Sequence, residues 1–250
     1  MFTKWKIASV AVLGVVSVAK GFVVHRGAPP TRQSIQLQAA ADGAGDSNEE
    51  RRKRLFESKG WPQIKEDMNT VPVFCCANGE GQPLKYQVNE YELAFFYCHV
   101  PDAKRELAKA KEETSIPGLD IVPYPLGEVF EMVSENQAII VPGAEDLSAA
   151  GCPAEVSPIG QQIPLFACMD IMQELEDGTA VLPLFFKLEE AKAALSMALK
   201  ADGGDAKDFE ITGLSLERAV EALATVPETP AFQFITPAAS IEHIEKYLNE

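Results

Sequence analysis

The stretch VPVFCC (residues 71–76) returns 92 residues later as IPLFAC (residues 163–168), and this repeat is the strongest indication of the fold. Each stretch leads through a glycine-containing turn into a second apolar run that ends in two phenylalanines. These runs are YELAFF (residues 91–96) and VLPLFF (residues 181–186), which end 90 residues apart. Short runs that are almost wholly apolar are typical of strands covered on both faces. The chain therefore carries two copies of one folding unit, and we predict that each copy opens with a β-hairpin.

The remainder of each copy repeats as well. A helix containing Ala-Lys follows each hairpin (residues 103–104 and 191–192), and its apolar residues recur at the spacing of one helical face. A short strand, a second helix, another strand (residues 138–141 and 232–235) and a terminal helix complete each copy. Strands of this composition need helices on both sides. We therefore predict an α/β fold of two internally related halves, about 71–150 and 163–250, that form one pseudo-twofold body with the sheet covered by helices.

A basic leader precedes the two copies. Residues 1–22 combine Lys4 and Lys6 with an apolar run from Ile7 to Val18, which predicts a signal peptide. This run is short for a permanent membrane anchor, the alternative interpretation. Residues 23–45 contain Arg, Ser, Thr, Gln and Pro and no acid before Asp42, which predicts a transit peptide and linker. With Phe22 at the junction, the leader resembles the bipartite presequence of algae with complex plastids, and residues 46–250 are the predicted mature domain.

Charge separates the leader from the body. Residues 1–41 have a balance of +5, which leaves −20 for the remainder of a chain whose net charge is −15. A strongly acidic body disfavours nucleic-acid binding, because phosphates are neutralised by Lys and Arg. It also disfavours docking on an anionic lipid surface, and it favours partners that carry basic segments.

The residues capable of chemistry form no recognisable catalytic or metal-binding pattern. The five cysteines include no C-x-x-C pair, and the chain lacks a P-loop, a nucleophile elbow and a dinucleotide fingerprint. Cys98 and His99 suggest nucleophilic chemistry, but neighbours on a strand point to opposite faces. We therefore expect that the protein is not an enzyme and that it binds neither a cofactor nor a metal ion.

Several of the motifs, in this order, resemble one known family. The first copy has VPVF (71–74), a glycine-bearing turn with Pro83-Leu84, Phe95-Phe96, PDAK (101–104) and VPYPLGEVF (122–130), and the second has IPLF (163–166) and PLFF (183–186). This arrangement is similar to that of the 22-kDa component family of the translocon at the inner envelope membrane of chloroplasts, the Tic 22-kDa-like family. The resemblance covers roughly residues 50–250.

The resemblance implies two related α/β halves with a shared sheet and exposed apolar grooves. It also implies a soluble protein of the plastid intermembrane space, without catalytic residues, that holds preproteins in the manner of a chaperone. The implied partners are preproteins with basic transit peptides and components of the import translocon. Nucleic acid is not among them, and peripheral contact with a membrane is compatible with the resemblance.

Phenylalanines at equivalent points of the two halves are the candidate apolar binding surface: Phe74, Phe96, Phe166 and Phe186. Most such rings belong to cores, but a duplicated body can leave a groove in each half, where an extended preprotein lies or adds a strand to a sheet edge. Two other classes remain open. A carrier of a small apolar ligand or lipid needs one deep cavity, and a scaffold subunit of a plastid membrane complex needs large apolar patches.

Overall fold

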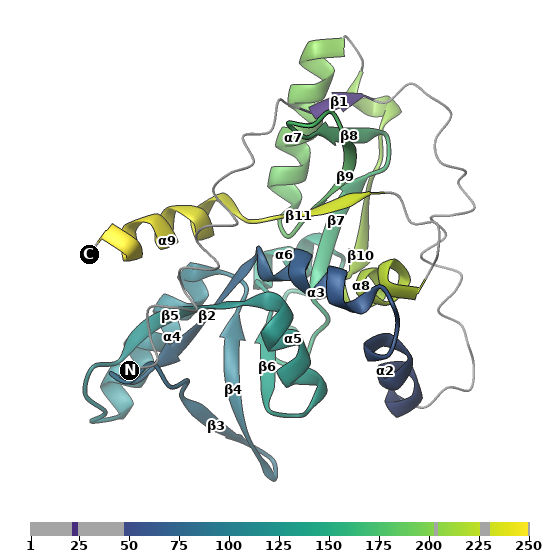
Figure 1. Cartoon of the computed structure of the whole chain (residues 1–250). Helices are drawn as coiled ribbons and strands as arrows, with labels where there is room; N and C mark the ends of the chain where they lie inside the picture. The colour runs from purple at the N-terminus through teal and green to yellow at the C-terminus, as the bar shows by residue number, and fades with distance from the viewer. Residues whose placement is uncertain (1–21, 25–47, 203–204, 226–230, 250) are drawn as a thin grey trace. The chain divides into compact units, whose positions relative to one another are not determined.

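The computed structural model describes residues 22–24, 48–202, 205–225 and 231–249 (Figure 1). Apart from Phe22–Val24, the predicted signal peptide and transit peptide lie outside the described residues. The chain divides into two compact units. Within the described residues, the first unit consists of 66–163 and 236–249, and the second of the remaining segments up to residue 65 and from 164 to 235.

The first unit contains a five-stranded sheet. Its strands are β2 (Pro72–Ala77), β3 (Lys85–Val88), β4 (Tyr91–Tyr97), β5 (Asp120–Pro125) and β6 (Ala138–Val141). Four of them follow the order β3-β4-β2-β5 through antiparallel pairs, and β6 pairs with β4 in parallel. The helices are α4 (Val100–Glu113), α5 (Leu126–Ser134), α6 (Ala144–Ala149) and α9 (Ala238–Asn249).

The second unit contains a six-stranded sheet. Its strands are β1 (Phe22–Val24), β7 (Pro164–Cys168), β8 (Ile171–Glu174), β9 (Ala180–Phe185), β10 (Ile211–Ser215) and β11 (Phe232–Ile235). Five follow the order β1-β8-β9-β7-β10, and β11 pairs with β9 in parallel. Its helices are α2 (Asn48–Phe56), α7 (Leu188–Asp202), α8 (Leu216–Thr225) and the short η1 (Ala206–Asp208). The helix α3 (Trp61–Asn69) is divided between the units, because the boundary falls between residues 65 and 66.

The two sheets have the same topology, which confirms the predicted duplication. In each copy the strand that opens the copy is antiparallel to the third strand, and their register joins equivalent positions: Phe74 with Tyr97, and Phe166 with Phe185. The second strand forms the other side of the hairpin, and the last strand pairs in parallel with the third. Such a match over five strands follows from a repeated sequence and confirms an α/β fold of two related halves.

Three details differ from the sequence-based expectation. Each copy has one strand more than the predicted hairpin, because β3 and β8 lie between the two apolar runs; β3 alternates exposed and half-buried residues and so lacks an apolar signal. The implied shared sheet is replaced by one sheet in each unit. Finally, α9, which follows the second copy in sequence, packs on α4 and belongs to the first unit.

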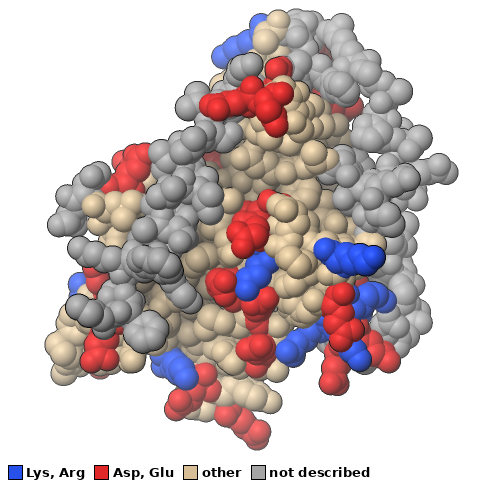
Figure 2. All heavy atoms as spheres, viewed as in Figure 1, with Lys and Arg blue, Asp and Glu red and all other residues tan. Residues whose placement is uncertain are grey.

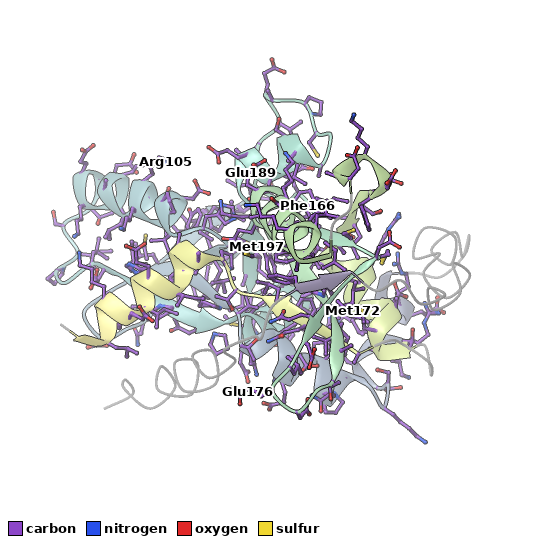
Figure 3. The ribbon with its side chains drawn as sticks, turned by 90° about the horizontal axis from the view of Figure 1, so that it is seen from above. Arg105, Phe166, Met172, Glu176, Glu189 and Met197 are labelled. Carbon is purple, nitrogen blue, oxygen red and sulfur yellow. The ribbon has the colours of Figure 1, made fainter. Side chains whose placement is uncertain are left out.

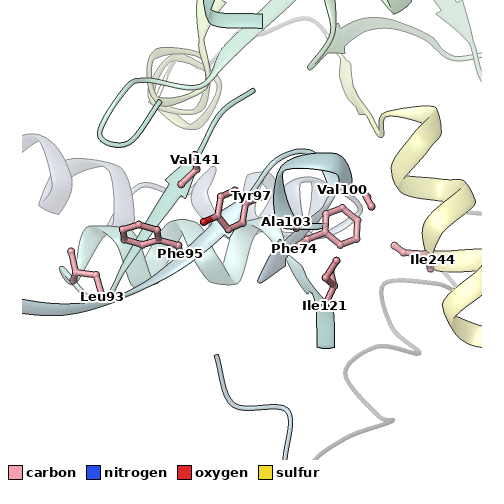
Figure 4. Packing of buried hydrophobic residues seen from close by; sticks show 9 residues of the cluster. All are labelled: Phe74, Leu93, Phe95, Tyr97, Val100, Ala103, Ile121, Val141 and Ile244. Carbon is pink, nitrogen blue, oxygen red and sulfur yellow. The ribbon is translucent and has the colours of Figure 1, made fainter. Parts of the chain in front are cut away.

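Buried apolar side chains fill the space between each sheet and its helices. In the first unit, residues of β2, β4 and β5 meet α4 and Ile244 of α9 (Figure 4). In the second unit, two adjoining clusters lie between the sheet and α7, one around Cys168 and Ile171 and the other around Phe166 and Phe185. Because strand residues alternate between faces, the same sheets also bury a second row of side chains against α5 and α8.

Candidate binding surface

The four phenylalanines predicted as an apolar surface are buried in the structure. Their exposed fractions are 0% for Phe74 and Phe96, 2% for Phe166 and 3% for Phe186. In this conformation they are core side chains, because Phe74, Phe96 and Phe166 lie in strands that are covered on both faces and Phe186 directly follows β9. Direct contact of these rings with a preprotein requires movement of the covering helices and stays a prediction.

Within each unit the predicted rings are also separated by the sheet. Phe74 shares a cluster with Phe95, and Phe96 follows Phe95 in β4, so Phe96 faces the opposite side, where its ring contacts Tyr124. In the second unit Phe166 shares a cluster with Phe185, so Phe186 again faces the opposite side, towards Phe234. The four rings therefore line no common groove within either unit.

An apolar strip that is exposed at one end lies instead on the β3–β4 hairpin. Tyr86 stacks on Phe95 with ring centroids 4.7 Å apart and an angle of 21° between the planes. Val88 is half-buried and pairs across the hairpin with Tyr91, which is 57% exposed. Residues opposite each other in an antiparallel pair share one face. We call Tyr86, Val88, Tyr91 and Phe95 the hairpin strip; it grades from buried to exposed towards the turn.

Carboxylates flank the exposed end of the hairpin strip. Glu90 and Glu92 adjoin Tyr91 in sequence, and both are exposed. Glu92 follows Tyr91 in β4 and so faces the other side of the sheet, and the two acids therefore set the charge around the end of the hairpin without lying on the same face as the ring. An exposed ring at an acidic hairpin end suits a segment that combines apolar residues with Lys or Arg, since a cation is attracted both by a ring face and by nearby acids. Figure 2 shows that acidic side chains also form several groups on the face in view, with basic ones between them.

In the second unit the equivalent aromatic contact comes from β1, which lies in the segment that the sequence predicts to be a leader. Phe22 of β1 lies with its ring centroid 5.9 Å from that of Phe185, the counterpart of Phe95. The Phe22 side chain is half-buried and packs against both clusters beneath α7. The two units thus bury equivalent phenylalanines against different partners.

Most of the cysteines are interior side chains of their own unit. Cys75, Cys76, Cys98 and Cys168 are buried and Cys152 is half-buried, all five with free thiols. Burial raises the pKa of the Cys75 thiol well above its ordinary value and that of Cys76 to about 11. A thiol with a raised pKa forms little thiolate at neutral pH and is a weak nucleophile.

His99 is held in a pocket of its own. Its Nε2 lies 2.9 Å from Oδ2 of Asp146 and its Nδ1 4.0 Å from Oδ2 of Asp102. Gly143 closes the pocket, because a Cβ there would meet the imidazole ring at 2.4 Å. His99 and Asp146 are both more than 90% buried, and this pairing joins the start of α4 to α6. The arrangement is that of a structural contact within the first unit.

Other ligand sites are few in the part of the chain that the structure describes. No group of three or more His, Cys, Asp or Glu side chains there is placed to hold a metal ion. None of the described helices combines the length and apolar character needed to cross a bilayer. A depression of about 610 Å³ lies on α7, lined by Lys192, Leu195, Ser196, Leu199, Lys200, Asp205 and Ala206. It lies open to solvent with charges along it, unlike the enclosed apolar chamber that a lipid carrier needs.

Sequence reasoning missed the hairpin strip and β1 for different reasons. Tyr86 and Val88 do alternate with polar neighbours, which is a strand signal, but the run of four residues is too short to stand out. Phe22-Val-Val24 has the β-branched and aromatic character of a strand, yet the basic, acid-free surroundings indicated a leader.

The fold and this surface define a class: duplicated α/β proteins with one sheet and a cover of helices in each unit. Two solved structures share the fold. Tic22 from Plasmodium falciparum matches with a TM-score of 0.62 and 19% identity, over 74% of this chain and 98% of that one. Tic22 from Anabaena, described as a protein transport protein, matches with a TM-score of 0.57 and 16% identity, over 74% of this chain and 96% of that one.

The likeness concerns the fold. No family model and no curated protein matches the sequence. The chain nevertheless has the Tic22 fold over nearly the full length of both structures, which confirms at the level of fold the resemblance that the sequence motifs indicated.

Proposed function

We propose that this protein is a plastid protein-import factor that holds preproteins in an extended, unfolded state between the envelope membranes. The observation that carries the proposal is the Tic22 fold over nearly the whole length of two solved structures, one of them described as a protein transport protein. The basic leader on an acidic body supports a plastid location and a passenger of opposite charge.

The hairpin strip is the proposed contact for the preprotein. An exposed tyrosine at a hairpin end that also carries two exposed carboxylates suits transit peptides, which are basic and poor in acids. The free edge of β3 supports the same interaction, because β3 ends its sheet among the described residues and an extended peptide can add to such an edge. Alternation of side chains along the added strand then brings every second one against the strip.

The test is retention of a transit-peptide-bearing precursor by the full chain at low and high salt. We expect retention at low ionic strength and a marked loss at 1 M salt, where the Debye length falls to about 3 Å. Tyr91→Ser is expected to weaken retention roughly threefold to tenfold, since aromatic anchors dominate such contacts. Ile159→Ser is the matched control, because Ile159 is 45% exposed but lies outside the hairpin strip.

Two results would overturn the proposal. If the chain retains no precursor even at low salt, the protein is not an import factor. If Tyr91→Ser and Ile159→Ser weaken retention of the precursor equally, the hairpin strip is not the contact. Stable co-purification with a detergent-solubilised membrane complex, without any binding of precursor, would favour the scaffold alternative.

A further inference from the structure

The outer edge of β8 holds a strand that comes from the leader. β1 pairs antiparallel with β8, with Phe22 opposite Gln173, Val23 opposite Met172 and Val24 opposite Ile171. Of the first 47 residues, the structure describes Phe22–Val24 alone. Figure 3 shows the site from above, with Met172 on β8 and Met197 on the neighbouring α7. A segment that the sequence assigns to the presequence therefore occupies an edge of the folded body.

Comparison with the first unit shows that, at the β8 edge, a side chain from another strand takes the place of one that β8 itself lacks. Val88 pairs with Tyr91 in one hairpin and Gln173 with Val181 in the other, and Tyr91 and Val181 are equivalent at the 90-residue offset. Val88 therefore corresponds to Gln173, and Tyr86, two residues before Val88, corresponds to Ile171. Where the first unit places its own tyrosine ring on Phe95, the second has a smaller isoleucine, and the ring of Phe22 contacts Phe185 instead.

The same comparison identifies a polar group that the fold does not use. Gln173 lies where the first unit has Val88, and only 5% of Gln173 is exposed. Its Oε1 receives no hydrogen bond among the described residues. A buried acceptor without a donor is unfavourable, and Phe22, which lies opposite Gln173, has no side-chain donor to offer. β1 is thus an imperfect occupant of the edge.

The charge around β8 matches the segment that occupies it. Acidic residues lie at both ends of β8: Asp170 precedes the strand, Glu174 is its last residue and Glu176 follows it. In sequence, Phe22-Val-Val24 lies between Lys20 and Arg26. An extended segment with an aromatic and β-branched centre and basic flanks therefore complements this edge in shape and charge.

We infer that the β8 edge is a strand-acceptor site for extended apolar segments with basic flanks, occupied in the precursor by its own leader and, after the leader is removed, by such segments of preproteins. The inference rests on the proposed function, since it names a second contact for the same passengers. While β1 is present it acts at the millimolar effective concentration of a tethered segment and excludes competitors. A donor from a passenger residue opposite Gln173 would complete the hydrogen bond that Phe22 leaves unmade.

The first test releases β1 in the full chain. Phe22→Asp places a carboxylate against the apolar clusters and near the acidic residues at the ends of β8, so β1 should no longer pair with β8. The probe is a fluorescein-labelled peptide of residues 19–27, followed by anisotropy. We expect binding to the Phe22→Asp chain to be about tenfold or more tighter than to the wild-type chain, in which β1 competes. The same peptide carrying Phe22→Asp should bind neither chain, and equal binding of the unmodified peptide to both chains would overturn the inference.

The second test locates the peptide on the folded chain. Val23 lies opposite Met172, and Gln87 of β3 is the equivalent of Met172 in the first unit. A peptide carrying Val23→Cys should therefore be joined by a short thiol cross-linker to Met172→Cys and several times less to Gln87→Cys, each in a Phe22→Asp, Cys152→Ser chain. Equal cross-linking at the two positions contradicts a specific site at β8.

The third test separates this inference from the proposed function. An unlabelled precursor protein is added to the complex of peptide and Phe22→Asp chain. Displacement of the peptide supports both. Retention of the precursor on the chain without displacement overturns the β8 site for preproteins and leaves the import function standing. Absence of precursor retention, with the peptide still cross-linked at Met172→Cys, overturns preproteins as occupants and the proposed function together, while leaving the edge as a docking place for the leader.

Discussion

The strands β3 and β8 occupy the same place in their sheets, yet their outer edges differ. β3 ends its sheet among the described residues, whereas β8 carries β1. The aromatic partner of Phe95 is the neighbouring Tyr86, while that of Phe185 is Phe22, more than 150 residues away in sequence. A duplicated fold thus preserves its topology and core positions, while its edges are free to acquire different partners. How far the two units are alike can be tested by substitution, beginning with the most buried positions.

The largest effect is expected in the two cores, where the units should behave alike. Phe74→Ala and Phe166→Ala each remove a buried ring at equivalent positions, and each should lower the free energy of unfolding by about 3–5 kcal/mol. Denaturant titration of the full chain, with Phe→Leu at the same positions as the milder control, measures both. A loss below about 1 kcal/mol at either position would show that one ring is not part of a well-packed core.

The His99 pocket should distinguish the first unit, because the second copy repeats neither Cys98-His99 nor Gly143. Asp146→Ala leaves the buried imidazole without its carboxylate and should cost about 1–3 kcal/mol. Gly143→Ala should cost a similar amount, since its methyl group collides with the ring. The exposed neighbour Glu145 supplies the control: Glu145→Ala should change stability by less than about 0.5 kcal/mol. Equal effects at Asp146 and Glu145 would contradict a structural role for the pairing.

The second unit should respond to acid through Glu221. Burial raises the pKa of this carboxyl, but the hydrogen bonds from Arg51 and Arg54, each 2.7 Å long, lower it by more, so the net pKa lies below its ordinary value. A depressed pKa gives stability that is present above the unfolded-state pKa, about 4.3, and is lost as the pH falls through the folded pKa. We expect the α2–α8 contact to contribute about 1 kcal/mol at neutral pH and to vanish in acid.

This prediction is checked by hydrogen exchange of α2 as a function of pH. Glu221→Gln should loosen α2 at pH 7 and remove the pH dependence, whereas Glu217→Gln, one turn earlier on α8, serves as the comparison. Unchanged protection of α2 between pH 7 and pH 3 in the wild-type chain would contradict the role of Glu221.

The smallest effect on global stability is expected for Phe22→Leu, which can be compared with removal of the equivalent aromatic contact in the first unit. Tyr86→Leu removes a stacked ring that is part of the first sheet and should cost about 0.5–1.5 kcal/mol beyond the loss of area. Phe22→Leu removes a tilted contact held by a three-residue strand, so global stability should change by less than that of Tyr86→Leu. The response to Phe22→Leu should appear instead as faster hydrogen exchange in β8. A larger global loss for Phe22→Leu would mean that β1 is integral to the second unit, as Tyr86 is to the first.

Much of the fold could be predicted from sequence because its signals are local. The helices α4, α7 and α8 follow from apolar residues at helical spacing, and Ser215 lies before α8 as expected of a capping residue, its Oγ accepting the Arg218 N–H at 3.4 Å. The strands β2 and β7 follow from apolar runs, and the 90- to 92-residue offsets imply that both copies fold alike. The site was harder to predict, because an apolar ring in a strand is buried or exposed according to what covers it, and the cover comes from distant segments.

Sequence patterns were enough to predict two related α/β halves and to mark off a basic N-terminal stretch, since repeats, periodicity and charge can be read without knowing any contact. Three features became apparent in the folded chain alone: Phe74, Phe96, Phe166 and Phe186 are core residues, α9 completes the first unit, and Phe22-Val-Val24 extends the second sheet. The physical reason is that local spacing fixes helices and strands, whereas burial and edge pairing depend on contacts between residues far apart in the chain, which no local pattern specifies.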